Sequence, residues 1–182
     1  MVRFEDVAPQ PWKNGGGVTR EMLTWPSVDD WLMRVSVADI DRDGPFSAFI
    51  GVDRWFAVLA GNGVRLGTPP KTLRCSDDAL HFNGDDAPDC TLIDGPTRDL
   101  NLMLRRDAAS GWMQRVAVGF EGGTGASLSG VFAVDGCAMG GRDGADVWVP
   151  SMSIAWCVDA PWRVVDCDAG ARLFAFQCVE RS

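Results

Sequence analysis

Short segments in which hydrophobic and polar positions alternate run through most of the chain. This period of two is typical of β-strands, and turns rich in Gly, Pro, Asp and Asn separate the segments. No segment has a sustained helical period with capping residues, so we expect almost no helix. Many short strands at regular spacing predict an all-β sandwich or barrel. The expected strands are residues 18–25, 31–40, 54–61, 89–95, 99–106, 112–120, 130–136, 153–160 and 171–180.

The alternation places a few polar side chains on strands that are otherwise apolar. Arg34 and Ser36 share one face of their strand, Arg54 shares a face with Phe56, and Asn101 lies opposite its leucine neighbours. Two alternatives stay open. If these faces meet solvent, the polar residues are ordinary surface. If the faces point into a barrel, buried polar groups need partners, and a ligand carboxylate would pair well with the planar fork of Arg54.

The length of 182 residues suits one large domain or two small ones. A break is expected near residues 105–112, which gives an N-terminal half at 1–108 and a C-terminal half at 109–182 in one compact body. Hydrophobic residues make up 46% of the chain and charged residues 23%, so a packed core is expected and disorder is not. Eight Trp and nine Phe predict aromatic cores or the aromatic walls of a pocket.

The net charge of −8 changes which partners are plausible. An acidic chain without a basic run is a poor nucleic-acid binder, and an anionic ligand needs a local cationic pocket. None of the six cysteines forms a C-x-x-C pair, the start has no apolar signal segment, and no run reaches membrane length. We therefore expect a cytoplasmic protein with reduced thiols and no membrane partner.

The stretch PWKNGGGVTRE, residues 11–21, combines a lysine, an asparagine and three glycines. It is not a phosphate-binding P-loop, because in that motif the lysine follows the glycines and a helix comes next. Here Lys13 precedes the glycines and a strand follows. Two alternatives stay open: the loop folds over a barrel mouth and presents Lys13 and Asn14 to a ligand, or it is a tight structural turn with a solvated lysine.

Three motifs together resemble one bacterial family. PWKNGGGVTRE, GPFSAFIGVDR at 44–54 and DLNLM at 99–103 are similar to the HutD/Ves family, closely over about the first 105 residues and loosely beyond them. The resemblance implies a cupin fold with two cupin-like barrels in one chain. It also implies an association with histidine utilisation, in which the protein limits pathway activity by binding an intermediate. Ile50 and His81 depart from the family pattern.

Metal-binding cupins hold their ion with two histidines and a glutamate at fixed spacing, plus a later histidine. On this chain the glutamate position carries Arg54, and the two histidine positions carry Phe49 and Ser47. A permanently cationic arginine repels a metal ion, and His81 is the only histidine. We therefore expect no metal and no cofactor.

An arginine in place of a metal predicts that the same pocket attracts an organic anion. Arg54 would bind the carboxylate, phenylalanine rings would form apolar walls, and neutral polar groups would orient the ligand. The candidate ligands are urocanate, formylglutamate or a formate-like carboxylate. The predicted ligand-binding residues are Lys13, Asn14, Arg34, Ser36, Phe46, Ser47, Phe49, Arg54, Phe56 and Asn101.

Catalytic signatures are sparse. A nucleophilic serine or cysteine needs a base, and His81, the only imidazole, has none of the expected context. Carboxylates such as Glu21, Asp53, Asp85 and Asp99 leave acid–base chemistry open. We expect a non-enzymatic regulator that binds a small carboxylate. The alternatives are a metal-independent isomerase or hydrolase acting on a similar acid, and an interaction module. A homodimer is also open.

Overall fold

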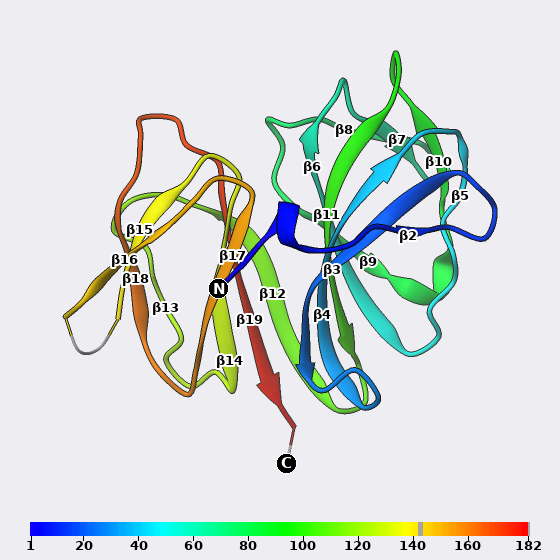
Figure 1. Cartoon of the computed structure of the whole chain (residues 1–182). Coiled ribbons are helices and arrows are strands. Elements are labelled where there is room, and N and C mark those ends of the chain that lie inside the picture. The colour runs from blue at the N-terminus through cyan, green and yellow to red at the C-terminus, as the bar shows by residue number, and fades with distance from the viewer. Residues whose placement is uncertain (142–143, 182) are drawn as a thin grey trace. The chain divides into compact units, whose positions relative to one another are not determined.

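The computed structural model of the protein describes residues 1–141 and 144–181. It is an all-β structure, as expected; the described helices are two 3-10 turns, η1 (Phe4–Asp6) and η2 (Gly84–Asp86). Two compact units make up the chain, and they are described separately below (Figure 1). One unit is Val7–Asp107, and the other combines Met1–Asp6 with Ala108–Ser182. The expected single compact body stays a prediction.

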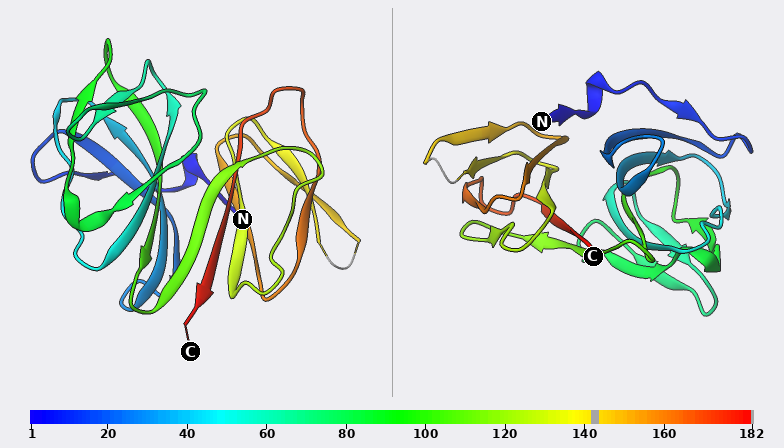
Figure 2. Two further views of the ribbon diagram at one scale, coloured as in Figure 1. Left: turned by 180° about the vertical axis from the view of Figure 1, so that it is seen from behind. Right: turned by 90° about the horizontal axis from the view of Figure 1, so that it is seen from below.

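The Val7–Asp107 unit contains two antiparallel sheets. In the view from below in Figure 2 its strands, coloured blue to green, curve into a barrel-like wall. The six-stranded sheet has the order β2-β3-β4-β11-β6-β9, and the four-stranded sheet has the order β5-β10-β7-β8. Their bounds are β2 (Gln10–Pro11), β3 (Gly17–Pro26), β4 (Trp31–Ile40), β5 (Gly44–Pro45), β6 (Val52–Ala60), β7 (Val64–Leu66), β8 (Lys71–Leu73), β9 (Leu80–Asn83), β10 (Asp89–Leu92) and β11 (Thr97–Arg105).

The second unit also contains two antiparallel sheets. One has the order β1-β17-β14-β19-β12, and the other has the order β13-β18-β15-β16. Trp162 joins its apolar core and donates a buried hydrogen bond from Nε1 to Ser129 Oγ at 2.8 Å. The bounds are β1 (Val2–Arg3), β12 (Ala109–Val116), β13 (Glu121–Gly122), β14 (Leu128–Ala133), β15 (Cys137–Gly140), β16 (Asp146–Val149), β17 (Ser153–Val158), β18 (Trp162–Asp166) and β19 (Leu173–Glu180).

Apolar residues from both sheets of the Val7–Asp107 unit meet in one core. This core takes Phe56 and Val58 from β6, and residues of β4, β7, β8 and β10 complete it. Burying such side chains stabilises the unit by about 25 cal/mol for each Å² of apolar surface removed from water. All six cysteines are free thiols, and three of them are buried. Within the described ranges, no helix has the length and apolar character to cross a membrane.

The three glycines of PWKNGGG close a hairpin between β2 and β3. Trp12 N–H donates to Gly17 O at 2.9 Å, and Gly15, with φ of +68°, donates back to Trp12 O at 3.0 Å. Gly17 is required for a different reason: a Cβ there would lie 2.2 Å from the carbonyl oxygen of Asp39. The hairpin can therefore lie close to β4 only because position 17 has no side chain.

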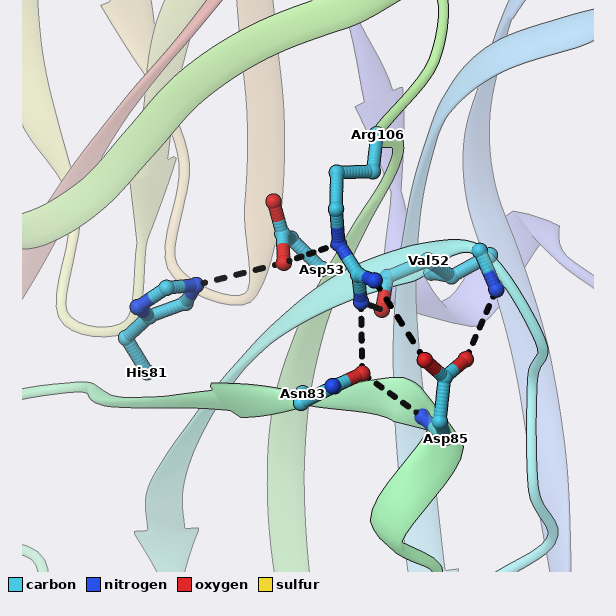
Figure 3. Close-up of polar contacts among 7 residues, drawn as sticks. Val52, Asp53, His81, Asn83, Asp85 and Arg106 are labelled. Atoms are coloured by element: carbon cyan, nitrogen blue, oxygen red, sulfur yellow. Dashed lines mark hydrogen bonds and ion pairs between the residues drawn. The ribbon is translucent and has the colours of Figure 1, made fainter.

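An arginine-centred cluster, which we call the Arg106 clamp (Gly51, Asp53, Asn83, Asp85 and Arg106), joins three segments of this unit (Figure 3). The guanidinium of Arg106 donates to Asp53 at 3.0 Å, to Asp85 at 3.3 Å and to Asn83 at 2.5 Å. Asp85 in turn accepts from Gly51 N–H at 2.7 Å. The clamp thus ties the turn before β6 to η2 and to the end of β11.

The clamp fixes the segment that precedes β6. Next to it, Phe49 N–H donates to Gly84 O at 2.8 Å, and a Cβ on Gly84 would lie 2.8 Å from Phe49 O. His81 lies at the edge of the clamp, 3.8 Å from Asp53, and stacks on Trp55 with ring centroids 4.3 Å apart. It belongs to β9.

Replacement of Gly17 tests the close packing of the hairpin. Gly17→Ala should lower the free energy of unfolding by about 2 kcal/mol or more, because a methyl group cannot fit against the Asp39 carbonyl without moving the strand. Gly16→Ala is the matched control, since the nearest atom there is the side-chain oxygen of Asn14 at 3.3 Å. Urea denaturation measures both variants, and equal losses would contradict the packing argument.

Acid titration of stability tests the Arg106 clamp. The Gly51 N–H bond and the guanidinium of Arg106 hold the pKa of Asp85 below its ordinary value of 3.8. A carboxyl whose folded-state pKa is depressed stabilises the protein above its unfolded pKa, and this contribution disappears as pH falls through the folded value. Asp85→Asn should therefore be less stable than the wild type at neutral pH, with the difference narrowing in acid.

The control for this titration is Asp107→Asn, which removes an exposed carboxylate 3.5 Å from Arg105. Exposed pairs contribute little to stability, so this variant should follow the wild type at every pH. Urea denaturation across the acid range measures all three proteins. A stability difference for Asp85→Asn that does not change with pH would show that the carboxylate charge does not act through the clamp.

Candidate functional site

A cavity of about 500 Å³ lies against one face of the six-stranded sheet. The hairpin that begins at β2 and the segment that follows β5 form its remaining walls. Its lining residues are Gln10, Pro11, Trp12, Lys13, Asn14, Thr19, Glu21, Arg34, Ser36, Ala38, Ile40, Pro45, Phe46, Ser47, Phe49, Arg54, Asp99, Asn101 and Met103.

Strand register arranges the sheet wall of this cavity in rows, because directly opposed residues of antiparallel strands share a face. Successive rows on that face are about 7 Å apart along the strands. One row contains Arg54, Met103 and Arg34; the next contains Phe56, Asn101, Ser36 and Glu21; the third contains Val58, Asp99, Ala38 and Thr19. In these rows Phe56 and Val58 belong to the buried core and do not line the cavity.

Arg54 is the central cation of the site. Its side chain is buried, and its guanidinium carbon lies 5.1 Å from the ring centroid of Phe46, 5.3 Å from that of Phe49 and 5.1 Å from that of Phe82. Ring faces attract cations through their quadrupoles, and this attraction is stronger where water is excluded. We call these three rings the phenyl cup.

Neutral oxygens supply the hydrogen bonds of the Arg54 guanidinium. Nη2 donates to Asn101 Oδ1 at 3.0 Å, and Nη1 donates to the carbonyl of Ser47 at 3.3 Å. Within the described residues Nε has no hydrogen-bond partner, and no carboxylate forms an ion pair with Arg54. Burial lowers the pKa of Arg54 to about 10, with a further lowering from Arg34 and an opposing effect from Asp99. The group is therefore still a cation at neutral pH.

Arg34, the second arginine of the cavity, already has a carboxylate partner. Its Nη2 lies 2.7 Å from Glu21 Oε1 across the β3–β4 pair. Its Nε, like that of Arg54, is buried without a hydrogen-bond partner in the described part of the chain. The Arg34–Glu21 pair contributes little net charge, so Arg54 is the main cation available to a buried ligand.

Asp99 is a carboxyl group at the wall of the cavity and is only 1% exposed. Asn101 Nδ2 donates a short hydrogen bond to its Oδ1. Burial raises the pKa of Asp99 well above the ordinary 3.8, Asp39 raises it further, and Arg54 partly opposes the shift. Asn101 therefore connects Arg54 to Asp99 through its two amide atoms.

The structure brings together nine of the ten predicted ligand-binding residues along this cavity. Lys13 and Asn14 are exposed on the hairpin at its edge, and Arg34, Ser36, Arg54 and Asn101 come from the sheet. The segment before β6 supplies the other three, Phe46, Ser47 and Phe49.

Phe56 was expected in the cavity wall and is not there. It is fully buried in the core between the two sheets, where its ring centroid lies 5.5 Å from that of Phe46. Phe56 thus supports the phenyl cup from behind. Its place in the cup is taken by Phe82 of β9, which was not among the predicted residues.

Several lining residues were missed by the sequence reasoning. Asp99 shares the face of Asn101 and Met103, so the alternation could have identified it. Glu21 lies directly opposite Ser36, but only the pairing of β3 with β4 reveals this. Trp12 and Thr19 also line the cavity, and Trp12 Nε1 donates to Thr19 Oγ1 at 2.7 Å.

Side chains that could bind a metal ion do not form a cluster in the described part of the chain. No cluster of three or more His, Cys, Asp or Glu side chains that could hold an ion occurs there. His81, the one imidazole, lies at the Arg106 clamp and does not line the cavity.

Comparison with known proteins agrees with this geometry. The chain is 40% identical over 108 residues to an uncharacterised 21.2 kDa protein in the hutC 3′ region of Pseudomonas putida, covering 57% of this chain and 56% of that protein. It is 36% identical over 114 residues to a protein named Ves from Citrobacter koseri, covering 58% and 59%. The aligned part thus spans somewhat more than half the length of these curated relatives.

Solved structures extend the likeness to the whole chain. The structure of HutD from Pseudomonas fluorescens SBW25 matches with a TM-score of 0.76 and 25% identity, covering 100% of this chain and 98% of that one. A cupin 2 conserved barrel domain protein from Leptotrichia buccalis shares the fold, with a TM-score of 0.58, 12% identity and coverage of 97% and 93%. The HutD family model matches residues 4–168. Because this match covers most of the chain, the chain belongs to the HutD family.

Proposed function

We propose that this protein binds a small organic anion at Arg54 without a metal ion and acts as a non-enzymatic regulator of histidine utilisation. The observation that carries the proposal is a buried guanidinium at a cavity wall, held by neutral oxygens and phenyl rings, with no carboxylate of its own. A ligand carboxylate supplies the missing charge, and charge-assisted pairs of this kind are strong.

The chemistry of the cavity favours a small carboxylic acid. Phe46 and Phe49 give it apolar walls, while Ser36 and Asn101 offer neutral polar groups. Urocanate, formylglutamate and a formate-like carboxylate all fit this description. The relative in the hutC 3′ region and the formate condition of the solved HutD structure support the same assignment.

A metal-free isomerase or hydrolase acting on a small carboxylic acid is the second candidate. Asp99 and Glu21 favour it, because both carboxyl groups line the cavity and could move protons. The position of His81 outside the cavity counts against it. Turnover of urocanate or formylglutamate by the pure protein would support the enzyme, and binding without turnover supports the regulator.

We also propose that each unit is a cupin-like half, as in a bicupin. Each unit pairs a larger antiparallel sheet with a four-stranded one, and this two-sheet arrangement supports the proposal. In this proposal the halves are close to residues 1–108 and 109–182, except that Met1–Asp6 belong to the second unit. The cytoplasmic location and the homodimer stay predictions.

Ligand titration of Arg54 variants tests the anion site. Formate, urocanate and formylglutamate should raise the melting temperature of the wild type, since a ligand that binds only the folded state stabilises it. Arg54→Gln should weaken binding about 10- to 100-fold, which corresponds to the loss of hydrogen bonds to a charged group. Isothermal titration calorimetry measures the dissociation constants.

The control for this titration is Arg105→Ala, which removes an arginine of β11 paired with Asp30 outside the cavity lining. This variant should bind like the wild type. If Arg54→Gln also binds all three acids like the wild type, the carboxylate site is not at Arg54.

Chelation tests the metal-free part of the proposal. Treatment with EDTA followed by dialysis should leave the ligand-induced rise in melting temperature unchanged, because Arg54 rather than an ion binds the carboxylate. Elemental analysis of the untreated protein is the accompanying measurement. A stoichiometric metal whose removal abolishes binding would overturn this part.

A further inference from the structure

Asp99, at the wall of the cavity, has one carboxyl oxygen without a hydrogen-bond partner among the described residues. Oδ1 accepts the hydrogen bond from Asn101, but Oδ2 is buried and has no hydrogen-bond partner in residues 1–141 and 144–181. A buried polar atom without a partner is destabilising unless a ligand or water satisfies it. Asp99 is one of the residues that line the cavity, so Oδ2 is the atom of its carboxyl group that is left for a bound ligand.

The nearby cation does not reach Asp99 directly. Arg54 Nη2 donates to Asn101 Oδ1, and Asn101 lies between the two charged groups. No ion pair of Asp99 occurs among the described residues. Burial therefore favours the neutral acid, which agrees with the raised pKa of Asp99.

The charged groups around Asp99 are also compatible with its neutral form. Arg34 is neutralised by Glu21, and Cys90 has a pKa raised to about 12, so its thiol is uncharged at neutral pH. An ionised Asp99 would cancel the charge of Arg54 and repel an anionic ligand. A neutral Asp99 leaves that charge free. The titratable or charged groups that face Asp99 or share its cavity are Arg54 on β6, Arg34 and Asp39 on β4, Glu21 on β3, Cys90 on β10 and Lys13 on the hairpin.

The hydrogen bond from Asn101 decides which oxygen holds the proton. Since Asn101 Nδ2 donates to Oδ1, that oxygen is an acceptor, and the proton of the neutral acid belongs on Oδ2. Among the described residues that line the cavity, three buried donors then have no partner: Arg54 Nε, Arg34 Nε and Asp99 Oδ2. A carboxylate has only acceptors, so it complements all three.

We propose that Asp99 is a ligand-binding residue that donates a hydrogen bond from protonated Oδ2 to the bound anion, so that the ligand binds the form of the protein in which Asp99 holds its proton. This inference rests on the proposed anion site. The proton comes from solvent and stays on Asp99, and no covalent bond forms or breaks. Anion affinity is therefore highest where Asp99 is already protonated, and it falls about tenfold for each pH unit above that range.

Asparagine at position 99 gives the sharpest test, because its Nδ2 donates like the neutral acid but cannot lose a proton at ordinary pH. The probe is sodium formate, whose own charge is constant above about pH 5.5. For the wild type, the dissociation constant should rise with pH above the range in which Asp99 of the free protein is protonated, and calorimetry at those pH values in buffers of different ionisation enthalpy should show proton uptake. For Asp99→Asn, binding should persist with no proton uptake and no dependence on pH.

Three further variants separate the possible outcomes. Asp30→Asn, at an exposed carboxylate paired with Arg105, should keep the wild-type pH profile. Asp99→Leu should bind formate weakly at every pH, because it offers no donor. Arg54→Gln should lose binding whether or not Asp99 takes part, so this variant reports on the anion site itself.

The inference is overturned if Asp99→Asn keeps the wild-type proton uptake, or if it loses binding while Arg54 is still required. In either case the anion site at Arg54 stands. If formate binding does not depend on Arg54, or if no acid binds the wild type, the proposed function fails and the inference fails with it. The protonation state of Asp99 can also be measured without ligand. The infrared band of a protonated carboxyl group should be present in the wild type at neutral pH and absent from Asp99→Asn.

Discussion

The burial of the Arg54 guanidinium is the constraint on which the rest of the site depends. Removing a cation from water has an unfavourable desolvation free energy, which a buried carboxylate usually offsets by forming an ion pair. Here an amide oxygen, a backbone carbonyl and three ring faces contact the guanidinium and offset this desolvation instead. These groups are neutral, so they stabilise the guanidinium without cancelling its charge. The result is a cation that is available to an anionic ligand inside a cavity with apolar walls.

Two of the three rings of the phenyl cup come from irregular backbone, and distant residues hold that segment in shape. Phe46 and Phe49 come from the segment between β5 and β6, where no strand pairing fixes the chain. The Arg106 clamp supplies that restraint through hydrogen bonds to Asp85 and to the strand-end groups around it. The residues of this region therefore divide by role. Some, such as Arg54 and Asn101, line the cavity, whereas others, such as Asp85, position the segment that closes it.

The alternation of side chains predicted much of this site because strand faces follow directly from a period of two. The alternation identified Arg54, Arg34 and Asn101 as polar residues on apolar strands and left open whether their faces meet solvent or a barrel interior. The structure places all three on the cavity side of the sheet. The short strands β7, β8, β15, β16 and β18 were not expected. They have three to five residues, which is too few to show a period, and pairing with neighbours defines them. Phe56 was misplaced for a related reason, since a phenylalanine in a core wall and one in a pocket wall have the same sequence pattern.

What the sequence determined by itself is the chemistry available to the fold: alternating strands, an arginine where a cupin metal site has its glutamate, and a chain with a single histidine. What only the tertiary structure decided is which groups meet. Asn101 contacts Arg54 across 47 positions of sequence, Glu21 neutralises Arg34, and Asp99 is removed from water beside them. Local sequence does not encode these neighbours, because the register of long-range strand pairs and the burial of the paired faces set both partners and charge states.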